Sequence, residues 1–569
     1  MKFALSFKSK GLAFLALVAT SLCAFFTFGA LSVTRAADDA PRVVASFSVS
    51  GANDLWGGAE RIADVMNYGD LVKGVRGLVN MRIKTDVLDP AKPLGVIAAT
   101  NGDEVAAFGY LPLLKPEEFD ETALNALKEK IVEIDENLFK GDYFVVDGAL
   151  VIGKESQKEL IAATLASVGS APSADETTLT RLQINVDAAP QEFIEAGAAL
   201  IRQKLAELAE GQSDNELQSV DRALDNYSEL VASLKSIEWT LAVDADSNLV
   251  SDIVVTPRPE TELAASFAKT AQTPTRWNAL AETPNAILFG INAGDAGAAN
   301  FKGDVEQIRQ AIHENLTSAL DALKDDPENL EVAKEIMQHV ENALVAEVAS
   351  EKYDSGIVIS ATPVTLAFAS CCAAPNELQA AVEKLVERLL KSKEASSVAF
   401  TKEDVEGYSV LNLTVPLNDV SDDLPEFFRG KSFCMRLGFS SDALLLVATL
   451  DEDAAKSTFE RVARGSHETA PQPNESFLDC SALAKALQSV LATFDDVRQQ
   501  ASDSIASFAN AEDARIVFTK SYNGGTFEMK TTIRTGFFKA LGDVVKINLV
   551  GGGNGDEGQD IDDLFDDEE

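Results

Sequence analysis

Residues 213–256 read SDNELQSVDRALDNYSELVASLKSIEWTLAVDADSNLVSDIVVT, and this stretch decides the fold class. From Ser213 to Trp239, apolar side chains recur at intervals of three, four, three, four and three residues, which predicts one face of an amphipathic helix. Two short apolar runs then flank the polar segment Asp244–Asn248, which predicts two strands joined by a turn. A long helix followed at once by a β-hairpin indicates an α+β protein.

The helical spacing recurs at three other places. Residues 194–208 show it just before the stretch at 213–239, so the two segments are expected to form an antiparallel helical hairpin. A second hairpin is predicted over residues 305–348, where Asp326-Pro327 supplies an N-cap followed by proline at the first helical position. A single helix of roughly 28 residues, about 42 Å long, is predicted from Leu483 to Phe508.

Further β-hairpins are indicated by short apolar runs on either side of turn residues. Tyr143–Gly153 contains Asp147-Gly148, a strong signal for a tight hairpin turn. Arg515–Arg534 contains Asn523-Gly524-Gly525, and its second run alternates apolar and polar side chains. Such alternation is typical of an antiparallel sheet with one buried and one wet face.

A weak internal repeat suggests that the mature chain consists of two related halves. The strand pair that begins at Leu94–Thr100 resembles the pair that begins at Ser355–Thr362, with an offset of about 261 residues. Toward the end of each half, a helix, a β-hairpin and a short helix recur with an offset of about 276 residues. We therefore expect two α+β halves, 37–275 and 276–548, each an antiparallel sheet packed against long helices and helical hairpins.

Both ends of the chain differ in character from the rest. Three lysines precede an apolar segment from Gly11 to Val33, and Thr34-Arg35-Ala36 has the small residues of a cleavage site. This predicts that residues 1–36 are a secretory signal peptide, with an uncleaved membrane anchor as the alternative. Residues 549–569 are glycine-rich and then strongly acidic, which predicts a disordered tail.

The charge balance excludes some functions. The chain has 569 residues, with 49 basic and 90 acidic side chains, and a net charge of −41. Nucleic-acid binding requires basic surface that displaces counterions, so it is not expected here. The sequence predicts an acidic extracytoplasmic protein, either periplasmic, cell-surface or secreted, with no stable membrane insertion after cleavage.

Four cysteines follow the signal peptide, and their pairing is left open by the sequence. Cys371 and Cys372 are adjacent, so in a strand they would point to opposite faces. The chain has no C-x-x-C motif. Free cysteines used as small core residues are the simpler expectation, and one Cys434–Cys480 bridge is the alternative.

No motif for chemistry is found, so no catalytic, cofactor-binding or metal-binding residue is predicted. The three histidines, His313, His339 and His467, do not form an H-E-x-x-H pair. Nucleophile elbows and phosphate-binding loops are also absent from the sequence. Asp244–Asn248 begins like a calcium-binding loop, but the glycine and glutamate that such a loop requires are replaced by Leu249 and Val255.

The layout resembles large secreted two-half α+β proteins of Gram-negative-type bacteria that have no characterised function. The resemblance rests on the leader segment and on Asp89-Pro90-Ala91-Lys92-Pro93-Leu94-Gly95, which leads into a strand pair. It implies export and an α+β fold, and it implies no activity.

Three functions remain open at this level. The first is a non-catalytic protein of binding, assembly or structural type, acting on a protein partner or through self-association. The second is a carrier of an apolar small molecule, which needs a phenylalanine-lined cavity of about 300 Å³ or more. The third is a hydrolase whose site has no recognisable motif, which needs converging titratable groups in a cleft.

Overall fold

The computed structural model describes residues 41–82, 89–118, 122, 142–168, 177–189, 230–295, 327–391, 398–417, 428, 430–491, 499–523 and 525–551, apart from residues 103 and 351. Within these residues the chain forms one sheet of 18 strands, in which every pairing is antiparallel. Helices pack on this sheet, so the expected α+β class is confirmed.

The elements have the following bounds. The strands are β1 (Arg42–Val49), β2 (Leu94–Thr100), β3 (Val105–Pro112), β4 (Asp142–Val146), β5 (Ala149–Gly153), β6 (Thr177–Asn185), β7 (Leu234–Val243), β8 (Leu249–Pro257), β9 (Ala286–Asp295), β10 (Lys352–Ala361), β11 (Val364–Cys371), β12 (Ala399–Val405), β13 (Tyr408–Pro416), β14 (Ser432–Phe439), β15 (Ala443–Thr449), β16 (Glu475–Asp479), β17 (Arg515–Asn523) and β18 (Thr526–Ile533). The helices are α2 (Ala52–Val65), α3 (Gly69–Arg82), α5 (Lys158–Val168), α8 (Glu262–Thr270), α10 (Pro327–Ala349), α11 (Pro375–Lys391), α12 (Glu452–Gly465), α13 (Cys480–Leu491), α14 (Gln499–Ala509) and α15 (Thr535–Gly551), with the short 3-10 helix η5 (Asn278–Glu282) before β9.

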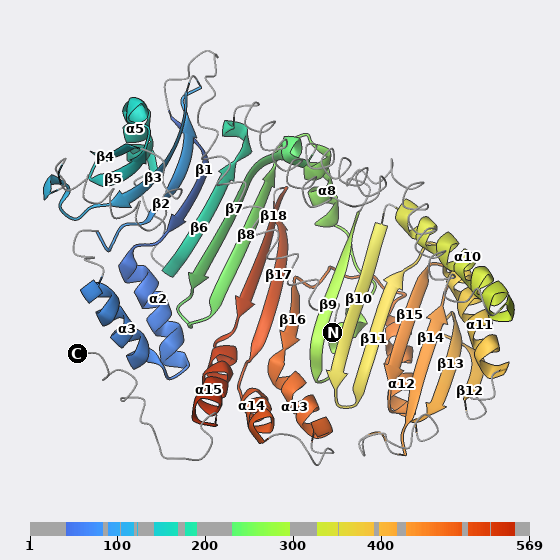
Figure 1. Ribbon diagram of the computed structural model, residues 1–569. Helices are drawn as coiled ribbons and strands as arrows, with labels where there is room; N and C mark the ends of the chain where they lie inside the picture. Colours follow the sequence, from blue (N-terminus) through green and yellow to red (C-terminus); the bar gives the residue numbers. More distant parts are fainter. Residues whose placement is uncertain are drawn as a thin grey trace.

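The strands follow one another across the sheet without a break (Figure 1). From one edge to the other the order is β4-β5-β3-β2-β1-β6-β7-β8-β18-β17-β16-β9-β10-β11-β15-β14-β13-β12. The last described strand, β18, therefore lies in the middle of the sheet, between β8 and β17.

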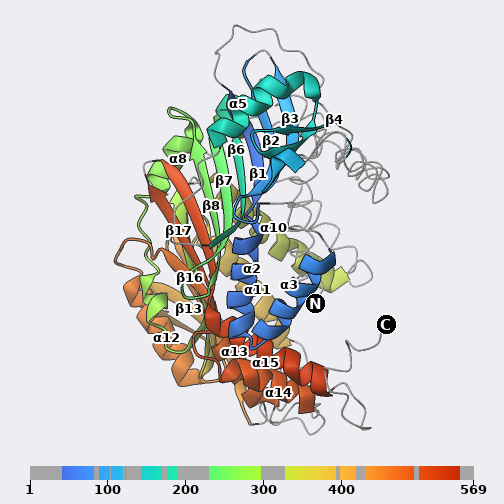
Figure 2. The same cartoon turned by 90° about the vertical axis from the view of Figure 1, so that its left-hand side faces the viewer.

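Helices cover both faces of the sheet. In the side view, α2, α3, α11, α13, α14 and α15 lie on one side of it and α12 on the other (Figure 2). One buried cluster joins α12 and η5 to strands β9–β11 and β13–β15, with Trp277, Phe459 and Leu445 at its centre. A second cluster joins α5 to β2–β5 through Ile161 and Phe108. Burying one such large apolar side chain stabilises the fold by about 1.5–3 kcal/mol.

The predicted hairpins form as their turn residues indicate. Asp147 and Gly148 both have positive φ, 48° and 76°, which the tight turn between β4 and β5 requires. Between β7 and β8, the Asp244 carboxylate accepts hydrogen bonds from the backbone N–H groups of Asp246 (3.0 Å) and Asn248 (2.9 Å). This segment is a turn, as the sequence analysis expects. The hairpin of β17 and β18 is confirmed as well.

Two helix predictions are wrong in part. The stretch from Leu234 to Trp239 belongs to strand β7, because Ile237 and Trp239 alternate with polar residues and pair with both β6 and β8. The single helix predicted from Leu483 to Phe508 is instead the two helices α13 and α14, which pack against each other. The apolar spacing is the same for one continuous helix and for two helices that pack against each other through their apolar faces, so the spacing alone does not distinguish them.

Other predictions are confirmed or fall outside the described residues. Helix α10 is described from Pro327 to Ala349, where the second helix of the hairpin was predicted, and its predicted N-cap Asp326 lies outside the described residues. Helix α15 is described as far as Gly551, and the predicted boundary between 548 and 549 stays a prediction. The predicted helices at 194–208 and 305–320, the signal peptide and the rest of the acidic tail lie outside the described residues.

Candidate functional site

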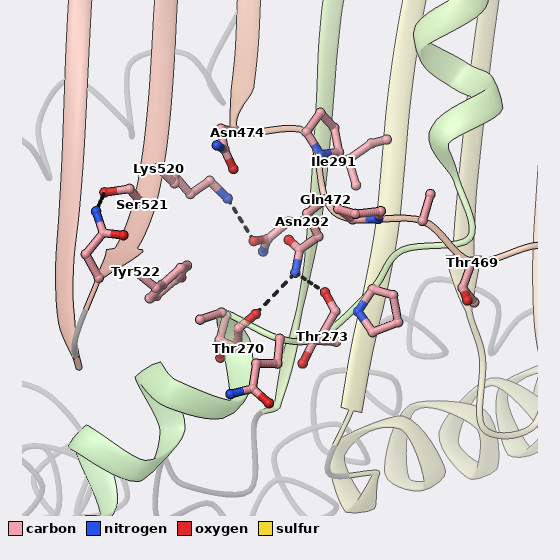
Figure 3. Close-up of a pocket in the computed structure, with 17 residues that line it drawn as sticks. Thr270, Thr273, Ile291, Asn292, Thr469, Gln472, Asn474, Lys520, Ser521 and Tyr522 are labelled. Atoms are coloured by element: carbon pink, nitrogen blue, oxygen red, sulfur yellow. Dashed lines mark hydrogen bonds between the residues drawn. The ribbon is translucent and has the colours of Figure 1, made fainter.

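A pocket of about 580 Å³ lies where α8, the start of β16 and the strands β9 and β17 meet (Figure 3). Its walls are formed by two loops and two strands. The lining residues are Thr270–Pro274, Ile291, Asn292, Thr469–Asn474 and Lys520–Asn523. The two loops belong to the polar and proline-rich stretches that interrupt the apolar pattern of the sequence.

Backbone and side-chain hydrogen bonds hold the two loops in place. Thr275 and Ala470 exchange a pair of backbone hydrogen bonds, each 2.9 Å long. The Gln472 amide nitrogen donates to the carbonyl oxygens of Thr273 (2.8 Å) and Ala293 (2.9 Å), and its oxygen accepts from the N–H of Ala293 (3.1 Å). Gln472 therefore holds the two loops against β9. Both its amide nitrogen and its amide oxygen already have hydrogen-bond partners, so its role in the pocket is structural.

Lys520 is the cation of the pocket wall. It lies on β17, its side chain points toward β9, and its Nζ donates a 2.8 Å hydrogen bond to Oδ1 of Asn292 (Figure 3). Burial lowers the pKa of Lys520, because the charged ammonium group loses water contacts. Among the described residues no carboxylate forms an ion pair with this lysine.

The rest of the lining is neutral. The described lining residues include no aspartate, glutamate, histidine or cysteine. The side chains of Gln272 and Asn474 form no hydrogen bond within the described residues. The Tyr522 ring packs against Phe267 and Phe527, with centroid distances of 5.9 and 5.1 Å. The described lining therefore offers amides, hydroxyls and one ammonium group to a polar molecule.

A second cluster of polar groups is buried beside the first loop. The Asp354 carboxylate accepts hydrogen bonds from the Thr275 hydroxyl (2.6 Å) and the Arg276 backbone N–H (2.9 Å). Burial raises the pKa of Asp354, although both hydrogen bonds act in the opposite direction. The Arg276 guanidinium forms a 2.7 Å ion pair with Asp442 and donates to the Ser466 carbonyl. This cluster is satisfied internally and holds the loop before β9 to the sheet.

Cys371 lies next to Arg276 but is not an activated nucleophile. Burial, and then the negative charge of Asp354, raises the pKa of the Cys371 thiol to about 11. The thiol therefore stays protonated at neutral pH, whereas nucleophilic attack requires the thiolate.

All four described cysteines are free thiols, and this gives a first testable prediction. When residues 37–569 are unfolded without a reducing agent, four thiols should react with Ellman's reagent. They are Cys371, Cys372, Cys434 and Cys480. The folded protein should react much more slowly, because burial raises the pKa of all four thiols. A count of two thiols in the unfolded protein would contradict the structure and support the Cys434–Cys480 bridge.

Neither His339, His467 nor the turn at Asp244–Asn248 lines the pocket. His339 on α10 contacts Glu377 on α11 (2.6 Å), and His467 contacts the carbonyl oxygen of Glu406 (3.0 Å). His313 lies outside the described residues. No group of three or more potential metal ligands occurs within the part of the chain that the structure describes.

Sequence reasoning missed the pocket and its lysine. One signal was present, since Lys520 lies between Phe518 and Tyr522 at a spacing of two residues and so shares their face of β17. Its neighbour Asn292 is 228 residues away in the chain, so no local pattern could connect the two.

Comparisons with known proteins return no match to this chain among family models, curated proteins or solved structures.

Proposed function

We propose that this protein is a non-catalytic extracytoplasmic binding protein whose pocket between α8, β9 and β17 takes a small polar molecule. The single observation that carries the proposal is the chemistry of the pocket wall. In a chain with 90 acidic residues, the described lining residues offer amides, hydroxyls and one lysine, and no carboxylate. Precisely placed neutral polar groups in a concave site are typical of ligand recognition.

A hydrolase is less well supported by the same residues. The buried carboxylates of Asp354 and Asp479 lie outside the pocket, and each accepts hydrogen bonds from neighbouring backbone and side-chain groups. They serve the fold and do not converge on a shared cleft, which a two-carboxylate mechanism would require.

An apolar carrier is also less well supported. Among the described lining residues, Tyr522 is the only aromatic residue, and none is a phenylalanine. Large phenylalanine side chains such as Phe108 and Phe459 are packed in the two core clusters.

The proposal includes two related halves, 37–275 and 276–548, and the order of strands supports this. The pairing β5-β3-β2-β1-β6-β7-β8 corresponds, step by step, to β15-β11-β10-β9-β16-β17-β18. Outside these strands, β4 corresponds to β14, and the hairpin β12–β13 is an addition to the second half. Helix α5 follows β5 as α12 follows β15.

The register at the centre of the sheet also supports a duplication. Ile253 of β8 pairs with Met529 of β18, and the two residues are 276 positions apart, which is the offset of the sequence repeat. A two-fold axis through this pair would exchange the halves. Ile97 belongs to the cluster under α5, and Phe289 belongs to the cluster under α12. The residues paired from strand to strand between them show that both side chains lie on the same face of the sheet. A two-fold axis perpendicular to the sheet requires this.

The location rests on the leader segment. Among the described helices, none combines the length and the apolar character needed to cross a membrane. The three lysines and the apolar segment at 11–33 support export, and cleavage after Ala36 would leave residues 37–569 as the mature protein. A protein partner and self-association remain predictions of the sequence alone.

Filling the pocket should abolish ligand binding. A panel of small neutral and charged polar molecules, tested by the shift in melting temperature, should contain compounds that stabilise residues 37–569. A ligand at 100 times its dissociation constant stabilises by about 2.7 kcal/mol. Asn474→Trp places an indole at the pocket wall and should remove the shift.

The matched control is Ser457→Trp on the exposed side of α12, which should leave the shift unchanged. If no compound stabilises the wild type, or if both variants retain the same shift, the pocket is not a binding site and the proposal is wrong.

A further inference from the structure

Resting on the proposed function, we infer that the pocket recognises a sugar acid, with the ligand carboxylate on Nζ of Lys520 and its hydroxyl groups on the surrounding amides. Three features of the described residues lead to this ligand class. They are the charge of Lys520, the donors that it keeps available, and the neutral groups around it.

The first feature is the positive charge of Lys520, which an anionic ligand would neutralise. Lys520 is partly buried as a residue, and its ammonium group has an amide oxygen, not a carboxylate, as its described partner. A buried charge without a counter-ion is costly, and the lowered pKa of Lys520 reflects that cost. A carboxylate from a ligand would supply the missing charge.

The geometry leaves room for that contact. A lysine ammonium has three N–H donors, and Asn292 takes one of them at 2.8 Å. The same hydrogen bond orients the side chain between β17 and β9, on the pocket wall (Figure 3). Two donors remain for an oxyanion, and a charge-assisted hydrogen bond is roughly twice as strong as a neutral one.

The rest of the wall selects the remainder of the ligand. Lys520 is the only charged side chain of the described lining, which suits one negative charge better than a phosphate dianion. The side chains of Gln272 and Asn474 have no partner within the described residues, and each amide both donates and accepts. Such groups match the hydroxyls of a sugar, and Tyr522 supplies an aromatic surface for its C–H groups.

The test uses defined probes with residues 37–569 and isothermal titration calorimetry. Glucuronate and galacturonate should bind, whereas glucose and galactose, which lack the carboxylate, should bind at least about tenfold more weakly. Acetate and inorganic phosphate carry the charge without the ring, and they should also bind at least about tenfold more weakly than the uronates.

Two variants separate the role of the charge from an effect on folding. Lys520→Met should lower uronate affinity at least about tenfold, and Lys456→Met on the exposed surface of α12 is the control that changes the net charge equally. Asn292→Asp supplies a carboxylate of the same shape beside Lys520, and it should block uronate binding without lowering the melting temperature.

The outcomes are distinguishable. If the hexoses bind as tightly as the uronates and Lys520→Met has no effect, the inference is overturned while the proposed binding function stands. If phosphate or acetate binds as tightly as the uronates, the site is a simple anion site and the sugar part is wrong. If no probe binds, the sugar-acid inference fails, and the broader ligand panel with Asn474→Trp decides the proposed function.

Discussion

Trp277→Ala is expected to lower the free energy of unfolding by about 3–5 kcal/mol, the range for removing a large aromatic side chain from a packed core. Trp277 is fully buried in the cluster beneath α12, and its indole Nε1 donates a 2.9 Å hydrogen bond to the carbonyl oxygen of Asp354. The Arg276 guanidinium lies over its ring at 5.2 Å. The variant therefore leaves a cavity, an unpaired buried carbonyl group and an arginine without its packing surface.

Urea unfolding followed by far-ultraviolet circular dichroism measures this loss. Trp277→Phe is the control, since it keeps much of the apolar area and loses the hydrogen bond, so its cost should be clearly smaller. A loss below about 1 kcal/mol for Trp277→Ala would mean that this side chain is not the centre of the cluster, because surface substitutions usually cost less than that.

Asp479→Ala is expected to cost about 2–4 kcal/mol. Asp479 is 8% exposed and ends β16 directly before α13. Its carboxylate accepts hydrogen bonds from the N–H groups of Ser481 (3.0 Å) and Ala482 (2.9 Å), and it forms a 2.9 Å ion pair with Arg515 of β17. The substitution removes the cap of a helix and the partner of a charged side chain at the same time.

The pH dependence of stability separates the two contributions. Burial alone would raise the pKa of Asp479, but the hydrogen bonds from Ala482, Arg515 and Ser481 outweigh it and hold the pKa below its usual range. The carboxylate therefore stabilises the fold above the unfolded pKa of about 3.9, and this stability is lost as the pH falls through the lower folded pKa.

Asp479→Asn keeps an oxygen that can cap α13 but cannot titrate. It should cost less than Asp479→Ala at pH 7, and its stability should fall less steeply than that of the wild type below about pH 4. Equal acid sensitivity in the two proteins would contradict the role of this carboxylate.

Those parts of the fold that depend on neighbouring residues could be predicted from the sequence. The hairpins around Asp147-Gly148 and Asp244–Asn248 follow from turn residues that act over four or five positions. The end of the predicted helix before Trp239 was wrong, because pairing of β7 with β6 and β8 overrides a helical stripe.

The candidate site could not be predicted, because its parts come from distant segments. Lys520 meets Asn292 only after β17, β16 and β9 have paired. The two loops are polar interruptions of the apolar pattern, but their mutual hydrogen bonds through Thr275 and Ala470 depend on the completed sheet. Sequence motifs for catalysis and metal binding consist largely of histidines, cysteines and carboxylates, whereas the described pocket wall contains amides, hydroxyls and one lysine.

The central position of β18 has a consequence for biosynthesis. Strand β8 receives its second neighbour from residues 526–533, which the ribosome adds last among the strands. Until then, the backbone groups along one side of β8 have no native partner, and an open strand of this kind can template wrong pairings with another chain. A nascent polypeptide therefore carries this hazard for roughly half of its synthesis, and molecules truncated before residue 526 should aggregate.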